Sequence, residues 1–167
     1  SKGCYEILRM NNVTYSGEID LSRVKYIDLA AKDEEKYLAQ KGDLLFNRTN
    51  SKELVGKTAV YDLEEPRAIA GYLIRVRTNT KNKPEYISGY LNSKRGKATL
   101  QHMCKSIVGM ANINAQELQD IRILIQPQEL QEDFAKLTHF VCEINKKNRA
   151  YLSEAEDLFA ALTRHLF

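Results

Sequence analysis

Three side chains near the middle of the chain have the types that a metal-dependent nuclease uses: Asp43, Glu53 and Lys57. Two carboxylates can hold a magnesium ion, and a lysine beside them can help to activate water. The nucleases with this set place Glu and Lys two residues apart on one strand, so that both side chains point to the same face. Here Glu53 and Lys57 are four positions apart, with Gly56 between them. The spacing disfavours this site, and metal-dependent cleavage is kept only as an alternative function.

Other catalytic arrangements are not visible in the sequence. The eight glycines are dispersed and form neither a GxGxxG nor a GxxxxGK[ST] phosphate loop. The three histidines (102, 139, 165) and the three cysteines (4, 104, 142) lie far apart, with no spacing typical of zinc ligands or of a disulfide framework. We therefore expect no catalytic residue, no metal site and no cofactor of the chain's own, and a reducing, cytoplasmic location.

A run of six polar residues follows an apolar, strand-like segment. Residues 43–46 read Asp-Leu-Leu-Phe, and they lead directly into Asn47, Arg48, Thr49, Asn50, Ser51 and Lys52. Such side chains suit the reading of base edges, because Asn pairs two-fold with adenine, Arg pairs two-fold with guanine, and Thr or Ser serves either base or phosphate. A plain solvated hairpin loop is the competing interpretation.

Three further polar clusters are candidates for contact with DNA. Arg9, Asn11 and Asn12 follow the first strand-like segment, and Lys94, Arg95 and Lys97 stand where we expect a helix to end. Lys105 and Ser106, followed by Asn112 and Asn114, complete the set of donors expected on loops. Lysine and arginine suit phosphates, although cations at a helix C-terminus also compensate the helix dipole.

The charge is unevenly distributed. Residues 128–167 carry five Lys/Arg and seven Asp/Glu, a net charge of −2. The whole chain has a net charge of +3, so the net charge of residues 1–127 is +5. A basic front part with a slightly acidic tail is expected if only the front part contacts a polyanion. We find no apolar run long enough to cross a membrane and no signal peptide at the start.

The tail from residue 128 to 167 predicts one long helix, since it contains neither Gly nor Pro and follows Pro127. Apolar residues recur in two interleaved series with a period of seven, which indicates a coiled-coil seam. Asn148 occupies one of the core positions, where a polar residue sets the register. The predicted dimerisation seam consists of Phe134, Leu137, Val141, Ile144, Asn148, Tyr151, Ala155, Leu158 and Leu162.

Residues 1–127 are expected to form a mixed α/β (α+β) domain. Strand-like segments occur at 6–10, 24–29, 43–47, 57–62, 71–77 and 122–125, and helices are expected at 33–40 and 84–104, the second with a break near Gly96. Asn114 and Glu117 have the spacing of a capping box. The chain therefore divides into a globular domain, 1–127, and one long helix, 128–167.

Several of these segments resemble landmarks of the specificity subunits of type I restriction–modification enzymes. Residues 42–57 (GDLLFNRTNSKELVGK) resemble a stretch common in that family, as do residues 7–13 (ILRMNNV) with 17–21 (GEIDL). Residues 90–93 (YLNS) and 112–118 (NINAQEL) are similar to later landmarks that precede a long helix. The similarity covers essentially the whole chain, in the family's order.

The resemblance implies a target-recognition domain that reads half of a split site in double-stranded DNA, followed by a spacer helix. It also implies partners: methyltransferase subunits, a restriction and motor subunit, and a second specificity half or a second copy of this chain. S-adenosylmethionine, ATP and magnesium would belong to those partner subunits. With one domain and one helix, the chain would be a half-subunit or a fragment. A protein-only coiled-coil assembly module is the third interpretation.

Overall fold

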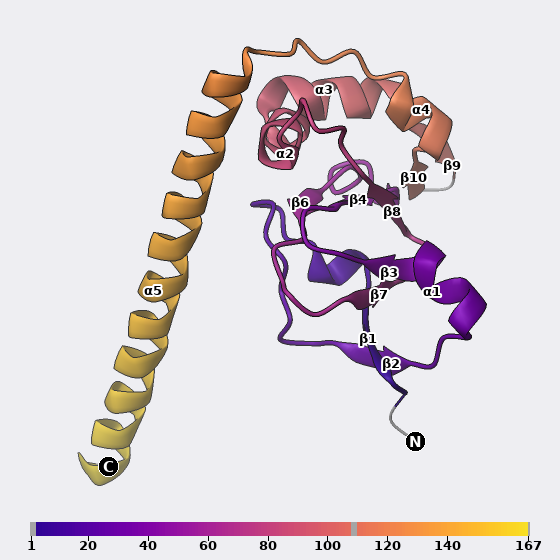
Figure 1. Ribbon diagram of the computed structural model, residues 1–167. Helices are drawn as coiled ribbons and strands as arrows, with labels where there is room; N and C mark the ends of the chain where they lie inside the picture. Colours follow the sequence, from indigo (N-terminus) through magenta and orange to yellow (C-terminus); the bar gives the residue numbers. More distant parts are fainter. Residues whose placement is uncertain (1–2, 108–109, 167) are drawn as a thin grey trace.

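The chain folds into a head of short strands and helices with one long helix beside it (Figure 1). The computed structural model describes the backbone of residues 3–107 and 110–166, and the side chains of residues 105–107 and 165–166 are outside that description. The head is followed by an extended crossing of residues 120–127 to the long helix α5 (Gln128–Leu166). This architecture confirms the predicted fold class, a mixed α/β domain followed by one long helix.

The described strands of the head form three small sheets. One sheet has the order β2-β1-β7-β3, a second has the order β6-β4-β8, and a third has the order β5-β10-β9. All pairs are antiparallel except β1 with β7. The strands are β1 (Tyr5–Leu8), β2 (Lys25–Ile27), β3 (Leu38–Ala39), β4 (Leu44–Asn47), β5 (Thr49–Asn50), β6 (Thr58–Val60), β7 (Arg67–Ile69), β8 (Leu73–Val76), β9 (Lys105–Ile107) and β10 (Met110–Asn112).

Strand β4 lies at the centre of the head, and both of its faces are buried. Leu45 packs into one hydrophobic core, with Leu8 and Tyr61, beneath the four-stranded sheet. Phe46 points the opposite way into a second core that contains Leu100 of the covering helices. Successive side chains of a strand alternate between faces. A strand between two cores therefore needs the continuous apolar run that residues 44–46 supply.

Helices cover the head, and the principal pair meets at a sharp corner. The helices are α1 (Ala31–Tyr37), α2 (Pro84–Asn92), α3 (Lys94–Met103) and α4 (Ala115–Gln119), with a single 3-10 turn at Met10–Asn12. The break between α2 and α3 falls at Ser93, not near Gly96 as predicted. The hydroxyl of Ser93 accepts a hydrogen bond from the amide of Gly96 and so caps α3. Gly96 is needed for a different reason: a Cβ there would lie 2.1 Å from the carbonyl oxygen of Tyr90.

Two other expectations about local structure have clear outcomes. The capping box at α4 is present, with the amide of Glu117 bonded to Asn114 and the amide of Asn114 bonded to Glu117. Residues 122–125 do not form the predicted strand, and Leu124 is 76% exposed in the extended crossing. Its carbonyl oxygen instead accepts a hydrogen bond from the hydroxyl of Tyr86. The apolar composition of that segment was therefore misleading.

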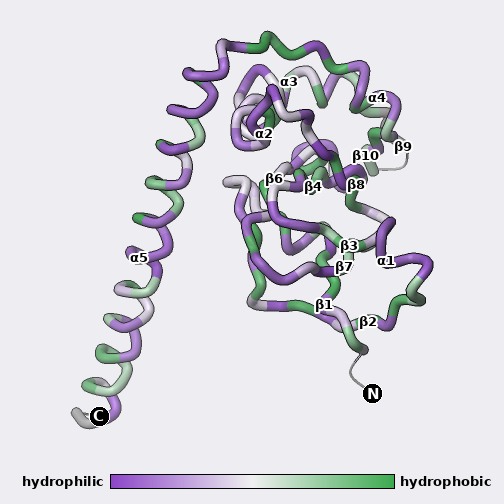
Figure 2. The backbone as a smooth tube through the Cα atoms, viewed as in Figure 1, coloured by the Kyte–Doolittle hydropathy of each residue, from purple (hydrophilic) through white to green (hydrophobic). Residues whose placement is uncertain are grey.

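Helix α5 has 39 residues, so it is about 58 Å long at about 1.5 Å per residue. Hydrophobic positions recur along its whole length (Figure 2). The helix is nonetheless amphipathic, and no helix in the described part of the chain combines the length and apolar character that crossing a bilayer requires.

Candidate nucleic-acid interface

The polar segment that follows β4 has a firmly held backbone. Asn47 bonds through its amide to Lys57 O, at 2.9 Å, and through its carbonyl oxygen to the amide of Gly56, at 2.8 Å. Arg48 donates its amide to Tyr72 O at 3.0 Å and accepts the amide of Ile113 at 2.9 Å. The segment therefore leaves the central sheet without becoming a loose loop.

The next two residues, Thr49 and Asn50, form β5 and pair with β10 opposite Asn112 and Ala111 respectively. The Asn112 carboxamide oxygen lies 3.0 Å from the Thr49 hydroxyl and 3.3 Å from Arg48 Nε, both of which donate to it. The sequence indicated Asn112 as one of several polar donors on loops, whereas the structure places it at the end of a strand beside Arg48 and Thr49. The signal for this placement was the alternation of residues 110–113, where Ala111 and Ile113 are buried while Met110 and Asn112 are exposed.

The polar residues differ in exposure. Arg48, Thr49, Asn50 and Ser51 are half-buried and Lys52 is exposed, so their side chains remain accessible. Asn47 is 0% exposed, and neither polar atom of its carboxamide has a partner among the described residues. Because a buried side chain cannot reach a groove of DNA, we remove Asn47 from the set of predicted contacts.

Two buried lysines connect the predicted clusters. Lys57 Nζ donates to the carbonyl oxygen of Met10 at 3.0 Å, which ties the segment 9–12 to β6. Lys97 Nζ donates to Gly56 O at 3.1 Å and to Asn92 Oδ1 at 3.2 Å, which ties α3 to the turn after the polar segment. Burial, and secondarily the charge of Lys57, lowers the pKa of Lys97 to about 8. Lys97 is only 9% exposed, so its predicted contact with phosphate is also withdrawn.

The residues of the cluster after β1 also differ in exposure. Asn12 is 2% exposed, and its carboxamide bonds to the amide of Arg9 at 2.9 Å and to Asp20 O at 2.8 Å. It holds the loop of residues 9–23 together, so it too leaves the predicted contact set. Arg9 is half-buried and donates from Nη2 to Arg23 O at 2.9 Å, whereas Asn11 is exposed. Asn11 is thus the more accessible of the two remaining candidates.

Lys94 and Arg95 are exposed and stand in the first turn of α3, not at the end of a helix as expected. Cations in a first turn lie beside unpaired amide groups and oppose the helix dipole. Dipole compensation therefore does not explain them, and their position concentrates positive potential on the surface. Lys105 begins β9, and its side chain lies outside the described part of the structure.

The two carboxylates of the alternative nuclease site lie in different surroundings. Asp43 is 3% exposed, and its carboxylate accepts from Arg77 Nε at 2.9 Å and from the amide of Gln40 at 2.8 Å. Glu53 lies exposed in the turn after the polar segment. Among the described residues, no group of three or more His, Cys, Asp or Glu side chains is arranged to hold a metal ion.

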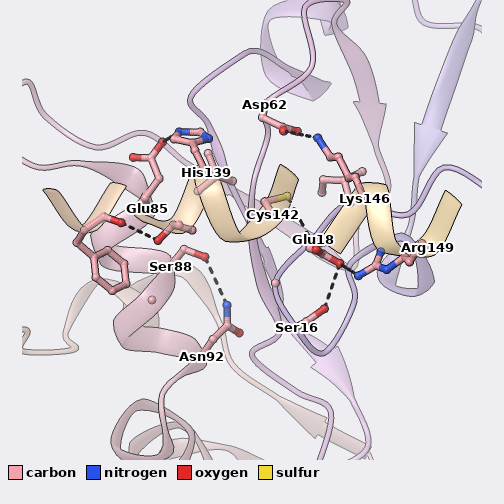
Figure 3. A pocket seen from close by; sticks show the side chains of 16 residues that line it. Ser16, Glu18, Asp62, Glu85, Ser88, Asn92, His139, Cys142, Lys146 and Arg149 are labelled. Carbon is pink, nitrogen blue, oxygen red and sulfur yellow. Dashed lines mark hydrogen bonds and ion pairs between the residues drawn. The ribbon is translucent and has the colours of Figure 1, made fainter. Parts of the chain in front are cut away.

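Helix α5 contacts the head along one face. Gln131 is 1% exposed and bonds to the amide of Lys83 at 2.9 Å, and the ring of Phe134 packs edge-on against Tyr86 with 6.0 Å between centroids. Further along, His139 pairs with Glu85 at 3.1 Å, Lys146 pairs with Asp62 at 3.6 Å, and Arg149 pairs with Glu18. Phe134 and the three ion pairs border a cleft of about 240 Å³ between helix and head (Figure 3).

The predicted seam lies on a neighbouring face of α5. The head-facing residues Ala135, Thr138, Cys142 and Arg149 each follow a seam residue by one position. Phe134 is the exception, because it belongs to the predicted seam and also packs against Tyr86 of the head. One position is about 100° of rotation around a helix. The larger seam residues are exposed, from Phe134 at 38% to Tyr151 at 66%, and Asn148 and Ala155 are exposed too. Dimerisation through Phe134, Leu137, Val141, Ile144, Asn148, Tyr151, Ala155, Leu158 and Leu162 stays a prediction.

Comparison with known proteins relates this arrangement to two curated relatives. The chain is 30% identical over 136 residues to a protein of Methanocaldococcus jannaschii named as the type I restriction enzyme MjaX specificity subunit, matching 80% of this chain and 32% of that protein. It is 24% identical over 135 residues to the type I restriction enzyme EcoKI specificity subunit of Escherichia coli K12, matching 79% of this chain and 29% of that protein. The chain therefore spans about a third of the length of these relatives.

A solved structure shares the fold. One chain of a structure that addresses complex assembly and conformational transition of the type I restriction–modification system matches 92% of this chain, with a TM-score of 0.63 and 13% identity. The match covers 40% of that chain. No family model matches the sequence. The two curated relatives, with this shared fold, confirm the resemblance seen in the sequence, and the chain belongs to the family of type I restriction enzyme specificity subunits.

Proposed function

We propose that the chain reads part of a target sequence in double-stranded DNA for a type I restriction–modification system and performs no chemistry itself. The observation that carries this proposal is the polar segment of residues 48–52. The backbone of Arg48 is bonded to Tyr72 O and to the amide of Ile113, and Thr49 and Asn50 pair with β10, while the side chains of residues 48–52 remain accessible. A rigid backbone that presents hydrogen-bonding side chains suits the reading of base edges.

The proposed contacts fall into two groups. Arg48, Thr49, Asn50, Ser51 and Lys52 face base edges, with Asn11 and Arg9 as neighbours. The cations at the start of α3 and β9 contact phosphates, which position the protein without reading sequence. The phosphate group comprises Lys94, Arg95 and Lys105.

The proposed partners follow from the family and from the exposed surface of α5. Methyltransferase subunits dock on the helix and supply S-adenosylmethionine chemistry, and a restriction and motor subunit supplies cleavage with ATP and magnesium. A second specificity half, or a second copy of this chain, covers the seam. The setting is cytoplasmic, in keeping with the free cysteines of the described residues, Cys4, Cys104 and Cys142.

Selection from a random DNA pool tests the reading of sequence. We expect the wild-type chain to enrich one short motif and Arg48→Ala to lose about 1–3 kcal/mol of preference at a single base position. Lys94→Ala should weaken binding to all sequences alike and reduce the salt dependence. Equal, sequence-independent losses from both variants would refute the division into base and phosphate contacts.

The same material separates the two alternatives. Magnesium-dependent cleavage of DNA by the purified chain, lost in Asp43→Asn, would favour a nuclease. The absence of DNA binding, with or without methyltransferase subunits, would favour a protein-only assembly module.

The solution mass of the chain tests the seam. Sedimentation equilibrium over a concentration series should give about 38 kDa, twice the mass of 19.2 kDa, if the seam pairs with itself. Leu158 lies in the seam beyond the ion pairs with the head, so Leu158→Lys should return the mass to that of a monomer. Ser153→Lys adds the same charge at an exposed position two residues from Tyr151 and from Ala155, on the opposite side of the helix from the seam, and is the matched control. A persistent wild-type monomer would assign the seam to another chain.

A further inference from the structure

Three side chains from two distant parts of the sequence form a hydrogen-bonded cluster at the edge of the polar segment. Arg48 and Thr49 stand where β4 continues into β5, and Asn112 ends β10. The Asn112 carboxamide oxygen accepts from Thr49 Oγ1 at 3.0 Å and from Arg48 Nε at 3.3 Å. Thr49 and Asn112 are also direct cross-strand partners, so the two backbones hold this contact in register.

Donor and acceptor chemistry determines the orientation of the Asn112 amide. The Nε–H of arginine can only donate, so the atom that faces it must be the carboxamide oxygen. The Asn112 nitrogen therefore points away from Arg48. No described residue bonds to that nitrogen or to the two terminal nitrogens of Arg48. Within the described residues, the cluster thus leaves hydrogen-bond donors without a partner on Arg48 and Asn112.

The backbone of Arg48 is held as firmly as its side chain. Its amide donates to Tyr72 O at 3.0 Å and its carbonyl oxygen accepts the amide of Ile113 at 2.9 Å. With the Cα fixed and Nε occupied, the guanidinium keeps one direction and one free edge. That edge carries Nη1 and Nη2, whose parallel N–H groups match two adjacent acceptors such as O6 and N7 of guanine.

We propose that Asn112 is a positioning residue for Arg48 and thereby a determinant of DNA sequence specificity. It holds the guanidinium so that only the terminal edge meets a base, which favours guanine read end-on in the major groove. The inference rests on the proposed function, since it assumes that Arg48 contacts DNA. A side chain that is already ordered loses less conformational freedom on binding. Loss of Asn112 should therefore weaken the preference for guanine about 2- to 10-fold.

The first test concerns the free protein and needs no DNA. The Nε–Hε signal of Arg48 in a ¹⁵N NMR spectrum is assigned by its absence in Arg48→Lys. We expect exchange of this hydrogen with water to be slow in the wild type and at least several-fold faster in Asn112→Leu, which removes the acceptor at similar size. Asn112→Asp keeps an acceptor oxygen and should keep the exchange slow. Met110→Leu, on the same exposed face of β10, is the control and should behave as the wild type.

The second test uses the same variants in selection from random DNA. Asn112→Leu should reduce the preference for guanine at the one position that Arg48→Ala also alters, and Asn112→Asp should retain that preference. A change at a different position would overturn the proposal, because Asn112 would then read a base by itself.

The two tests distinguish a failure of the positioning role of Asn112 from a failure of the proposed function. Unchanged exchange of the Arg48 hydrogen in Asn112→Leu overturns the positioning role even if the chain selects a DNA motif. Failure of the wild-type chain to select any motif overturns the proposed function, and the specificity role of Asn112 with it, even if the NMR result is as expected.

Discussion

Lys97 makes the stability of the protein depend on pH in a direction opposite to that of most lysines. Its ammonium is buried between Gly56 O and Asn92 Oδ1, and burial together with the charge of Lys57 lowers its pKa to about 8 from an ordinary value of 10.5. Between these two values the unfolded chain binds more protons than the folded one. The free energy of unfolding therefore increases as the pH rises through this window.

The magnitude follows from the width of the window. At about 1.4 kcal/mol per pH unit, the gap between about 8 and 10.5 corresponds to at most about 3.5 kcal/mol. The full cost of keeping the charged amine buried is present below pH 8 and is relieved progressively up to about 10.5. Substitution with methionine removes the charge and keeps most of the apolar stem, but gives up the two hydrogen bonds.

Urea denaturation of the wild type and Lys97→Met at several values between pH 7 and 10.5 measures this effect. The difference between their free energies of unfolding should shift by about 2–3 kcal/mol in favour of the wild type across the range. The tyrosines and cysteines that titrate in the same range are common to both proteins and cancel in the difference. Lys94→Met, which removes an exposed lysine from the same helix, should run parallel to the wild type.

A second variant checks the cause. Lys57 is itself buried, and its charge contributes to the low pKa of Lys97. In Lys57→Met the pKa of Lys97 should therefore be higher, so the increase in the free energy of unfolding should begin at a higher pH. Parallel curves for the wild type and Lys97→Met would refute the reasoning, because they would mean that the amine is as well solvated in the folded protein as in the unfolded chain.

Three further predictions concern the scaffold. Gly96→Ala should lower the free energy of unfolding by about 1–3 kcal/mol, because the new Cβ would lie 2.1 Å from a backbone carbonyl oxygen. Gly71→Ala, whose Cβ would have no atom within 4 Å, should not lower it, and thermal denaturation compares the two variants. Asn114→Ala should cost about 1 kcal/mol in urea denaturation because it removes the cap of α4, and an unchanged midpoint would contradict this. Arg149→Gln should leave the midpoint of urea denaturation nearly unchanged, since the arginine of its ion pair with Glu18 is largely exposed, and a clear fall in the midpoint would show that the pair anchors α5.

The features predicted from the sequence are those that local chemistry determines. The long helix follows from forty residues without Gly or Pro and from a period-seven repeat, and the cap at Asn114 follows from a four-residue motif. The central strand β4 follows from its apolar run. Strands β5 and β10 were missed because they are two and three residues long and are defined by pairing across about sixty residues of sequence.

The candidate site was predicted by residue type but not by orientation. Asn12, Asn47 and Lys97 have side chains that suit DNA, and all three are buried. Lys97 stands three positions before the fully buried Leu100, which places both on one face of α3, and this spacing was the available signal. For Asn47 the signal was weaker, because only the tertiary structure shows that both faces of β4 are covered.

Helix α5 contacts the head on one face and presents the predicted seam on another, so it can relate the head to a partner helix. The first half of the helix contacts the head through Gln131, Phe134 and the pairs at His139, Lys146 and Arg149. The seam residues after Phe134 lie about 100° away and are exposed. A helix that paired with the seam would therefore meet a surface whose angle to residues 48–52 is already determined. The distance and rotation between this polar segment and anything carried by the partner helix would then depend on the register of the seam, in which Asn148 is the one polar core residue. The register of the seam and the placement of residues 48–52 on the head would together determine that distance and rotation.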